Sequence, residues 1–157
     1  MTDLQDKSEL VCVTNDIPET VSFFLSLGRD YLSGLPIDDR ERFLQSILAR
    51  RKEPDRWLLL LKRKGEYSGL IHMKIDKDER SGWGFILEFY IVPSKRRLGW
   101  GRRLFNLSLE ILRVQDVEDV WLLTDQASEK FWRSLGFEET GEVDRETGQK
   151  IMVTSIR

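Results

Sequence analysis

The sequence contains very little cysteine and histidine. Cys12 is the single cysteine and His72 the single histidine among 157 residues. One thiol cannot form a disulfide framework, and it cannot build a cysteine-based metal site. We therefore expect no bound metal, and we interpret Cys12 as a small buried hydrophobic residue.

Long apolar runs and an excess of one charge are also absent. The longest apolar run, Trp57–Leu61, is far shorter than the roughly 20 residues that cross a bilayer. The first residues lack the apolar core of a secretory signal. The 25 basic residues nearly balance the 27 acidic ones, which argues against general nucleic-acid binding. We expect a cytoplasmic protein that binds neither nucleic acid nor a membrane.

The apolar content is sufficient for one folded domain. Hydrophobic residues make up 40% of the chain and charged residues 33%, so we expect a single domain over residues 1–157. Hydrophobic periodicity and turn residues predict the order β-α-α-β-β-β-α-β-α-β-β, a mixed α+β pattern. The strands are predicted over residues 9–14, 56–62, 68–76, 83–92, 117–124, 137–143 and 150–156. The alternation in 68–76 predicts a half-buried strand.

One strand–loop–helix segment carries the clearest functional signal. An apolar strand ends at Pro93, and Gly99 and Gly101 precede a predicted helix over residues 102–115. A helix start offers unpaired N–H groups and partial positive charge, and glycines let an anion approach the backbone. Four arginines add charge suited to phosphate, namely Arg96, Arg97, Arg102 and Arg103. The segment predicts a pyrophosphate site; the alternative is an ordinary strand–helix turn with solvated arginines.

The same segment resembles a known family. Arg96–Gly101, Arg-Arg-Leu-Gly-Trp-Gly, resembles the Arg/Gln-x-x-Gly-x-Gly/Ala signature of the GCN5-related N-acetyltransferases (GNAT family). The stretches 87–93 and 127–137 resemble two further motifs of that family. The resemblance implies an acyl-coenzyme A N-acyltransferase fold. Its sheet is mixed, mostly antiparallel and seven-stranded, splayed between strands 4 and 5 and flanked by about four helices.

The resemblance also implies acetyl-coenzyme A as cosubstrate. The pantetheine would pair with the backbone of the fourth predicted strand, at Tyr90, Ile91 and Val92, as if adding a strand. The pyrophosphate would bind the loop and helix start, which comprise Arg96, Arg97, Leu98, Gly99, Trp100, Gly101, Arg102 and Arg103. The resemblance also places two residues beside the cofactor: Asp125, just before the motif at 127–137, and Phe131, within it. Asp125 could instead cap the following helix.

Acyl transfer to an amine needs a base that removes a proton from the ammonium group. Glu88 is the first candidate, because it shares a strand face with Tyr90 by period-2 alternation. The alternative for Glu88 is a carboxylate paired with a basic residue across the sheet. His72 is the second candidate, and its alternative is a structural strand histidine. Many family members use a water chain instead of one base.

A departure from the family pattern leaves the function open. Trp132 stands where the family often has a tyrosine that protonates the leaving thiolate, and an indole is too weak an acid for that step. The first hypothesis is direct N-acetyl transfer to a primary amine of a small molecule, peptide or protein. The alternatives are a non-catalytic acyl-coenzyme A sensor or regulatory domain, and a plain phosphate-binding module. By resemblance, residues 31–51 would bind the acceptor, and a homodimer is allowed.

Overall fold

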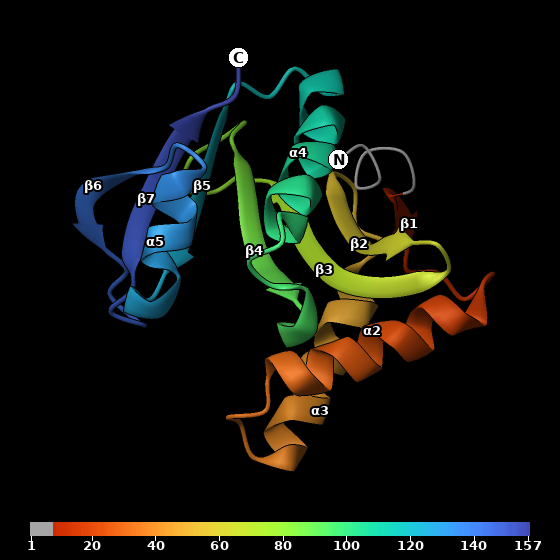
Figure 1. Cartoon of the computed structure of the whole chain (residues 1–157). Helices are drawn as coiled ribbons and strands as arrows, with labels where there is room; N and C mark the ends of the chain where they lie inside the picture. Colours follow the sequence, from red (N-terminus) through yellow and green to blue (C-terminus); the bar gives the residue numbers. More distant parts are fainter. Residues whose placement is uncertain (1–7) are drawn as a thin grey trace. The chain divides into compact units, whose positions relative to one another are not determined.

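The computed structural model describes residues 8–157. Their element order is the predicted one, β-α-α-β-β-β-α-β-α-β-β, with one short 3₁₀ turn added (Figure 1). The strands are β1 (Ser8–Cys12), β2 (Arg56–Arg63), β3 (Glu66–Ile75), β4 (Gly84–Ile91), β5 (Asp119–Thr124), β6 (Glu138–Val143) and β7 (Lys150–Ser155). The helices are α2 (Pro18–Tyr31), α3 (Ile37–Arg50), α4 (Trp100–Val114) and α5 (Gln126–Ser134), and the 3₁₀ turn is η1 (Pro93–Lys95).

The strands form a mixed seven-stranded sheet in the order β1-β2-β3-β4-β5-β7-β6. The β1–β2, β5–β7 and β6–β7 pairs are antiparallel, whereas β4 and β5 are parallel. The register of the β4–β5 pair joins Gly84–Ile86 to Val120–Leu122. Because β4 continues to Ile91, this pairing covers less than half of the strand. The expected α+β fold, with its interruption between strands 4 and 5, is confirmed.

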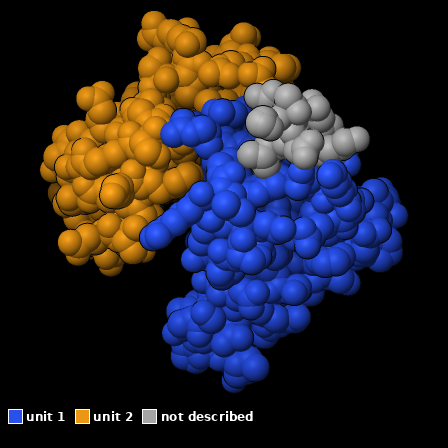
Figure 2. Space-filling view, in the orientation of Figure 1, with its two compact units in different colours: residues 1–72, 88–107 blue, residues 73–87, 108–157 orange. Residues whose placement is uncertain are grey.

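The chain divides into two compact units (Figure 2). Unit 1 comprises residues 1–72 and 88–107, and unit 2 comprises residues 73–87 and 108–157. Strand β3, strand β4 and helix α4 each contribute residues to both units. That residues 1–157 form one domain stays a prediction.

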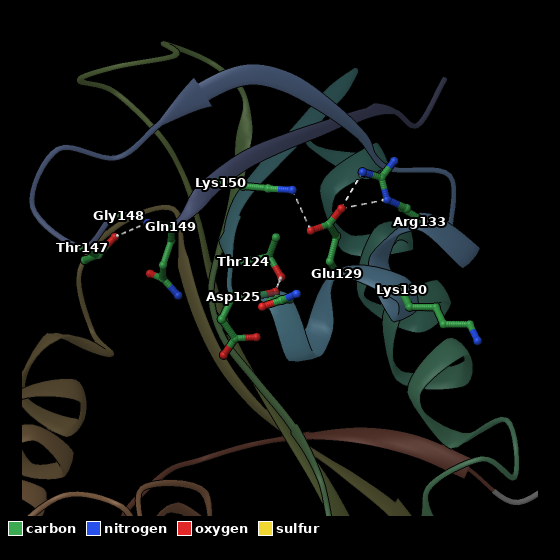
Figure 3. A pocket seen from close by; sticks show the side chains of 10 residues that line it. Thr124, Asp125, Glu129, Lys130, Arg133, Thr147, Gly148, Gln149 and Lys150 are labelled. Carbon is green, nitrogen blue, oxygen red and sulfur yellow. Dashed lines mark hydrogen bonds and ion pairs between the residues drawn. The ribbon is translucent and has the colours of Figure 1, made fainter.

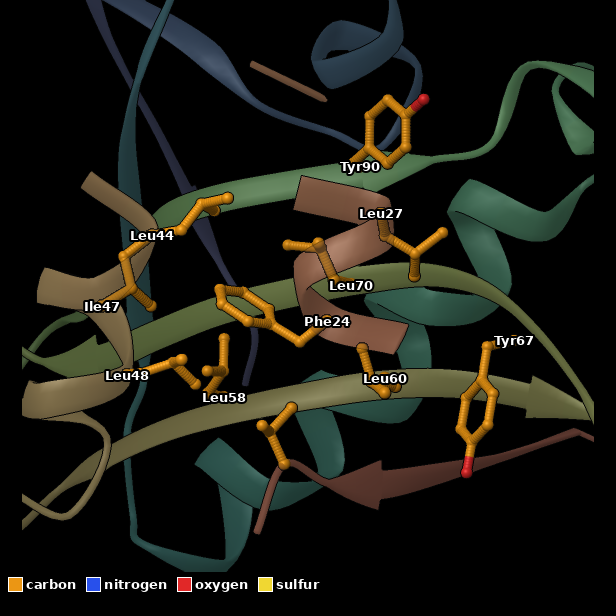
Figure 4. Packing of buried hydrophobic residues seen from close by; sticks show 11 residues of the cluster. Phe24, Leu27, Leu44, Ile47, Leu48, Leu58, Leu60, Tyr67, Leu70 and Tyr90 are labelled. Atoms are coloured by element: carbon orange, nitrogen blue, oxygen red, sulfur yellow. The ribbon is translucent and has the colours of Figure 1, made fainter. Parts of the chain in front are cut away.

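The core of unit 1 lies between the sheet and the two helices α2 and α3 (Figure 4). Phe24 of α2, Leu44 of α3 and Leu70 of β3 are each about 1% exposed. The two helices approach closely at Gly28, where an added Cβ would lie 2.5 Å from Leu44 Cδ2. Tyr90 of β4 belongs to the same cluster, so this face of the strand that was predicted to bind the cosubstrate is packed against α2 and α3.

Unit 2 is built on the β5, β7 and β6 strands with helix α5. Asp125 is the N-cap of α5 and accepts a hydrogen bond from Ser128 N at 2.9 Å, which satisfies one of the free amides of the helix start. Gly136 follows the helix with φ of +99°, a conformation that favours glycine. Val120, Leu122 and Met152 are almost completely buried.

Two expectations about burial are wrong. Cys12 is exposed, because it is the last residue of the edge strand β1. Strand β3 is buried along most of its length instead of being half-buried. Leu70 on one face belongs to the cluster with α2 and α3, and Gly69 on the other face lies against Leu104 of α4. In residues 8–157 no helix has the length and apolar character that a membrane span requires.

Candidate active site

The loop before α4 has the backbone conformation of an anion site. Arg97 has φ of +63° and Gly99 has φ of +90°, so left-handed residues alternate through the turn that leads into the helix. Helix α4 begins at Trp100, two residues earlier than predicted, and its first backbone hydrogen bond runs from Arg103 N to Gly99 O at 3.0 Å. Within residues 8–157, the N–H groups of positions 98–101 donate no backbone hydrogen bond. The loop therefore presents the unpaired amides that the sequence predicts.

The arginines of this loop have different surroundings. Arg96 Nε donates to the carbonyl oxygen of Ile91 at 2.8 Å, and its guanidinium lies 5.2 Å from the centre of the Tyr90 ring. Arg103 Nε donates to Ser8 Oγ at 2.8 Å. Arg97 and Arg102 are exposed. Arg96 and Arg103 thus bind groups of the protein, and they hold the loop to β4 and β1.

Trp100, between the two glycines of the motif, is a packing residue. It is 5% exposed, and the guanidinium of Arg63 lies 5.1 Å from its ring. The indole therefore anchors the first turn of α4 in unit 1, while the neighbouring backbone amides stay at the surface of the turn.

At the end of β4, the backbone groups of one edge face β3 and those of the other edge point away from it. Val92 N donates to Ser68 O of β3 at 2.9 Å. The carbonyl of Tyr90 also faces β3, since a Cβ added to Gly69 would lie 2.8 Å from it. By alternation along a strand, the N–H and C=O of Ile91 point to the opposite side, where the carbonyl accepts the bond from Arg96. Of the predicted backbone donors, Ile91 N–H is therefore the one directed away from β3.

Glu88 is a partly buried carboxylate on β4. Tyr31 Oη, at the end of α2, donates a hydrogen bond to Glu88 Oε1 at 2.6 Å. Burial raises the pKa of Glu88 to about 7, against the opposing influence of the Tyr31 hydrogen bond and the charge of Arg50. A carboxylate that titrates near neutral pH suits a general base.

His72, the second base candidate, is fully buried on β3. Its Nε2 lies 2.8 Å from Arg56 Nη1, and because a guanidinium only donates, Nε2 is the acceptor in this contact. The Arg56 side chain is itself 6% exposed and also contacts Glu53 at 3.2 Å. His72 belongs to unit 1 with Glu88, but its Nε2 lone pair is already engaged.

Unit 2 contains a polar cavity of about 790 Å³ between α5 and the β6–β7 hairpin (Figure 3). Asp125, predicted as a cofactor contact, lines it and is at the same time the helix cap, so the capping alternative is confirmed. Phe131 does not line it; its ring packs edge-on against Trp132 at 4.9 Å. Trp132 is 5% exposed and also contacts Phe137, so it is a core residue of unit 2.

A closed ring of ion pairs joins three elements at this cavity. Glu129 pairs with Arg133 and with Lys150, and Glu139 pairs with the same two cations. The Glu129 side chain is 16% exposed, so it is not a fully solvated helix charge. Figure 3 shows Glu129 directed at both Lys150 and Arg133.

Sequence analysis missed the link between Tyr31 and Glu88. Tyr31 stood out only as one member of the region that the resemblance assigns to the acceptor. The two residues are 57 positions apart, and no local spacing joins a helix end to a strand that distant. The available signal was the lone acidic residue in an apolar strand, which needs a polar partner when it is buried.

Comparison with known proteins agrees with this geometry. A profile described as the acetyltransferase (GNAT) family matches residues 21–137. Comparison of the sequence with curated proteins gave no match.

Several solved structures share the fold. PaiA N-acetyltransferase from Thermoplasma acidophilum in complex with coenzyme A has a TM-score of 0.72 at 15% identity, covering 95% of this chain and 99% of that one. An aminoglycoside 6′-N-acetyltransferase complexed with coenzyme A has a TM-score of 0.75 at 14% identity, covering 95% and 97%. Tetrahymena GCN5 has a TM-score of 0.70 at 16% identity, covering 95% and 96%.

Proposed function

The chain belongs to the GNAT family of acetyltransferases, and on this premise we propose that it transfers the acetyl group of acetyl-coenzyme A directly to a primary amine. The acceptor is a small molecule or the amine of a peptide or protein. The observation that carries the proposal is the partly buried Glu88 carboxylate on the strand that leads into the amide-rich loop, where it accepts a hydrogen bond from Tyr31. Burial raises the pKa of Glu88 to about 7.

The loop fits the diphosphate of coenzyme A. The N–H groups of residues 98–101 lie at the start of α4, where the helix dipole favours negative charge. Gly99, at φ of +90°, lets the backbone turn without a side chain. Arg97 and Arg102 are exposed beside this turn. Contacts of Asp125 and Phe131 with the cosubstrate stay predictions, since both residues belong to unit 2.

Acetyl-coenzyme A supplies an acetyl group already activated as a thioester. Glu88, as the carboxylate, accepts a proton from the acceptor ammonium, which frees the nitrogen lone pair for attack. The N–H of Ile91 is the donor we assign to the thioester carbonyl, because the N–H of Val92 is bonded to Ser68. The C–N bond forms as the C–S bond breaks; water takes the second proton from the nitrogen and delivers one to the departing thiolate, so that the amide and the free thiol of coenzyme A result.

The buried position of Trp132 favours one competing function. No tyrosine occupies its place, and the indole is part of the unit 2 core, so the residue that often assists thiolate departure is missing. A non-catalytic domain that binds acyl-coenzyme A as a sensor or regulator needs no such acid. Catalysis remains the preferred proposal, because a thiolate is a good leaving group and because Glu88 has the pKa of a working base.

Thiol release with acetyl-coenzyme A separates the two functions. The enzyme should release coenzyme A in the presence of some member of a panel of small amines, polyamines, aminoglycosides and peptide N-termini. The acetylated amine should appear in equal amount by mass spectrometry. Tight coenzyme A binding by calorimetry without turnover on any amine would support the sensor instead.

A further inference from the structure

Within residues 8–157, the carboxylate assigned as base has one hydrogen-bond partner, and that partner comes from helix α2, far away in the sequence. We propose that Tyr31 is a positioning residue for Glu88: its hydroxyl fixes the orientation of the carboxylate and favours the charged form that accepts a proton. This inference rests on the proposed role of Glu88 and names the group that tunes it.

The geometry of the pair supports a directed bond. Tyr31 is the last residue of α2, and its Oη lies 2.6 Å from Glu88 Oε1, a distance typical of a hydroxyl donating to a charged oxygen. The Tyr31 ring packs against the Tyr90 ring, with centroids 5.5 Å apart and planes tilted by 54°. Tyr31 also contacts the apolar cluster of unit 1. The ring is therefore held by packing, and the hydroxyl is aimed at one oxygen.

The other charged groups around Glu88 act without such contact. Arg50 at the end of α3 acts on Glu88 through its charge. His72 of β3 lies two residues beyond Leu70 and so faces the same side of the sheet. On β4 itself, burial and the charge of Asp30 raise the pKa of Tyr90, and Arg96 opposes them. Among the residues that the structure describes, only Tyr31 donates a hydrogen bond to Glu88.

Two opposing influences therefore set the titration of Glu88. Burial favours the neutral carboxyl group, and the Tyr31 hydrogen bond favours the carboxylate. Removing the hydroxyl leaves the burial in place and takes away the main opposing influence. Because a hydrogen bond to a charged group is worth more than one to a neutral group, we expect the titration midpoint to rise by about one pH unit.

The test compares Tyr31→Phe with a matched variant, Tyr67→Phe. Tyr67 belongs to the same apolar cluster, and its hydroxyl lies 3.4 Å from a different carboxylate, that of Glu19. Carboxyl ¹³C chemical shifts of labelled glutamate, assigned with Glu88→Gln, follow the Glu88 titration without any need for turnover. The acid limb of kcat against pH is measured in parallel.

In Tyr31→Phe we expect the titration midpoint of Glu88 and the midpoint of the acid limb of kcat to move together to higher pH. KM for acetyl-coenzyme A should stay unchanged, and kcat should recover at high pH. Tyr67→Phe should leave both at the wild-type values. An unchanged Glu88 midpoint in Tyr31→Phe, or an equal rise in Tyr67→Phe, would overturn the inference. If the Glu88 midpoint rises in Tyr31→Phe but neither the wild type nor either variant acetylates any amine, the positioning role stands and the proposed function fails.

Discussion

At the scale of single residues, Glu88 is held in a state that favours function over stability. Burial raises its pKa from an ordinary value of 4.5 to about 7, so the folded protein binds a proton that the unfolded chain has lost between these values. The unfolding free energy therefore falls as pH rises from 4.5 to 7, by up to about 3 kcal/mol. The same carboxylate is the proton acceptor of the proposed reaction.

Replacing Glu88 with glutamine should expose this conflict. Glu88→Gln keeps the shape and an oxygen for Tyr31, but it cannot take a proton, so we expect kcat to fall by roughly 10²- to 10⁴-fold. At pH 8 the variant should be more stable than wild type, and at pH 4 equally stable, because wild-type Glu88 is then neutral. Urea denaturation at the two pH values gives the stabilities, and thiol release gives kcat.

The wild-type rate should also depend on pH in a defined direction. Activity needs the carboxylate, so kcat should fall as pH drops below about 7, with a single protonation on the acid side. Glu19→Gln is the control, because Glu19 is a carboxylate of the same unit that contacts Tyr67 and not the base. An acid limb that persists in Glu88→Gln would show that another group is the base.

Some residue properties follow from sequence and others do not. Glu88 is identifiable because an acidic residue in an apolar strand is unusual, and the cap role of Asp125 follows from its position before a helix. The exposure of Cys12 was not predictable, since it depends on β1 being an edge strand. The engaged Nε2 of His72 likewise depends on Arg56, which sequence spacing does not connect to it.

At the scale of elements, the junction of η1 and α4 depends on one backbone angle. Gly99 has φ of +90°, which an alanine adopts only with strain, whereas Gly34 has no positive φ and open space around it. Gly99→Ala should lower the unfolding free energy by about 1–3 kcal/mol and weaken coenzyme A binding, because the amides of the turn shift. Gly34→Ala should leave binding unchanged. Calorimetric titration with coenzyme A is the measurement, and equal affinity in both variants would contradict the amide site.

The ion-pair ring gives a second prediction at this scale. Arg133 and Lys150 lower the pKa values of Glu129 and Glu139, and a lowered carboxyl pKa stabilises the fold above the unfolded value of 4.5 and loses that effect as pH falls through the folded value. Glu129→Gln should therefore lower Tm at pH 7 and low salt. The difference should shrink in 1 M salt and below pH 4.5.

A double-mutant cycle tests whether the four charges act as a ring. We expect the Tm losses of Glu129→Gln and Lys150→Met to add up to more than the loss of the double variant, because the two residues share one network. The pair Arg42 and Asp39, which is exposed on α3, is the control and should show near-additive changes. Additive losses in the ring would show that its members act separately.

Element order was predictable because each segment has its own hydrophobic period. Helix α4 begins two residues before the predicted start, because the first helical turn accepts Gly101, which the sequence pattern assigns to the loop. Strand β3 is more buried than its sequence predicts, because the alternation of Leu70 and His72 with apolar neighbours does not show that α4 covers the second face. Such errors concern what packs on an element, and that is set by distant parts of the chain.

At the scale of the whole molecule, neither compact unit is a continuous segment. Unit 2 takes residues 73–87 from the middle of the chain, and Gly84–Ile86 of that stretch form the parallel pairing with β5. Unit 1 takes residues 88–107, which include the amide-rich loop. A strand or helix that contributes to both units cannot unfold in one and stay intact in the other. We therefore propose that residues 1–157 behave as one domain.

Calorimetric unfolding should show one transition in which the calorimetric and van't Hoff enthalpies agree, with an enthalpy of about 110 kcal/mol near 60 °C. In unit 1, Gly28→Ala places a Cβ 2.5 Å from Leu44 Cδ2. In unit 2, Leu122→Ala removes a side chain that is 1% exposed and leaves a cavity in the core. Each should lower the same Tm by several degrees, since both act on one cooperative fold. Two resolved transitions, each sensitive to only one of the substitutions, would mean that the units are independent domains. Strand β3 would then have to break between His72 and Met73, and strand β4 between Leu87 and Glu88, next to the proposed base.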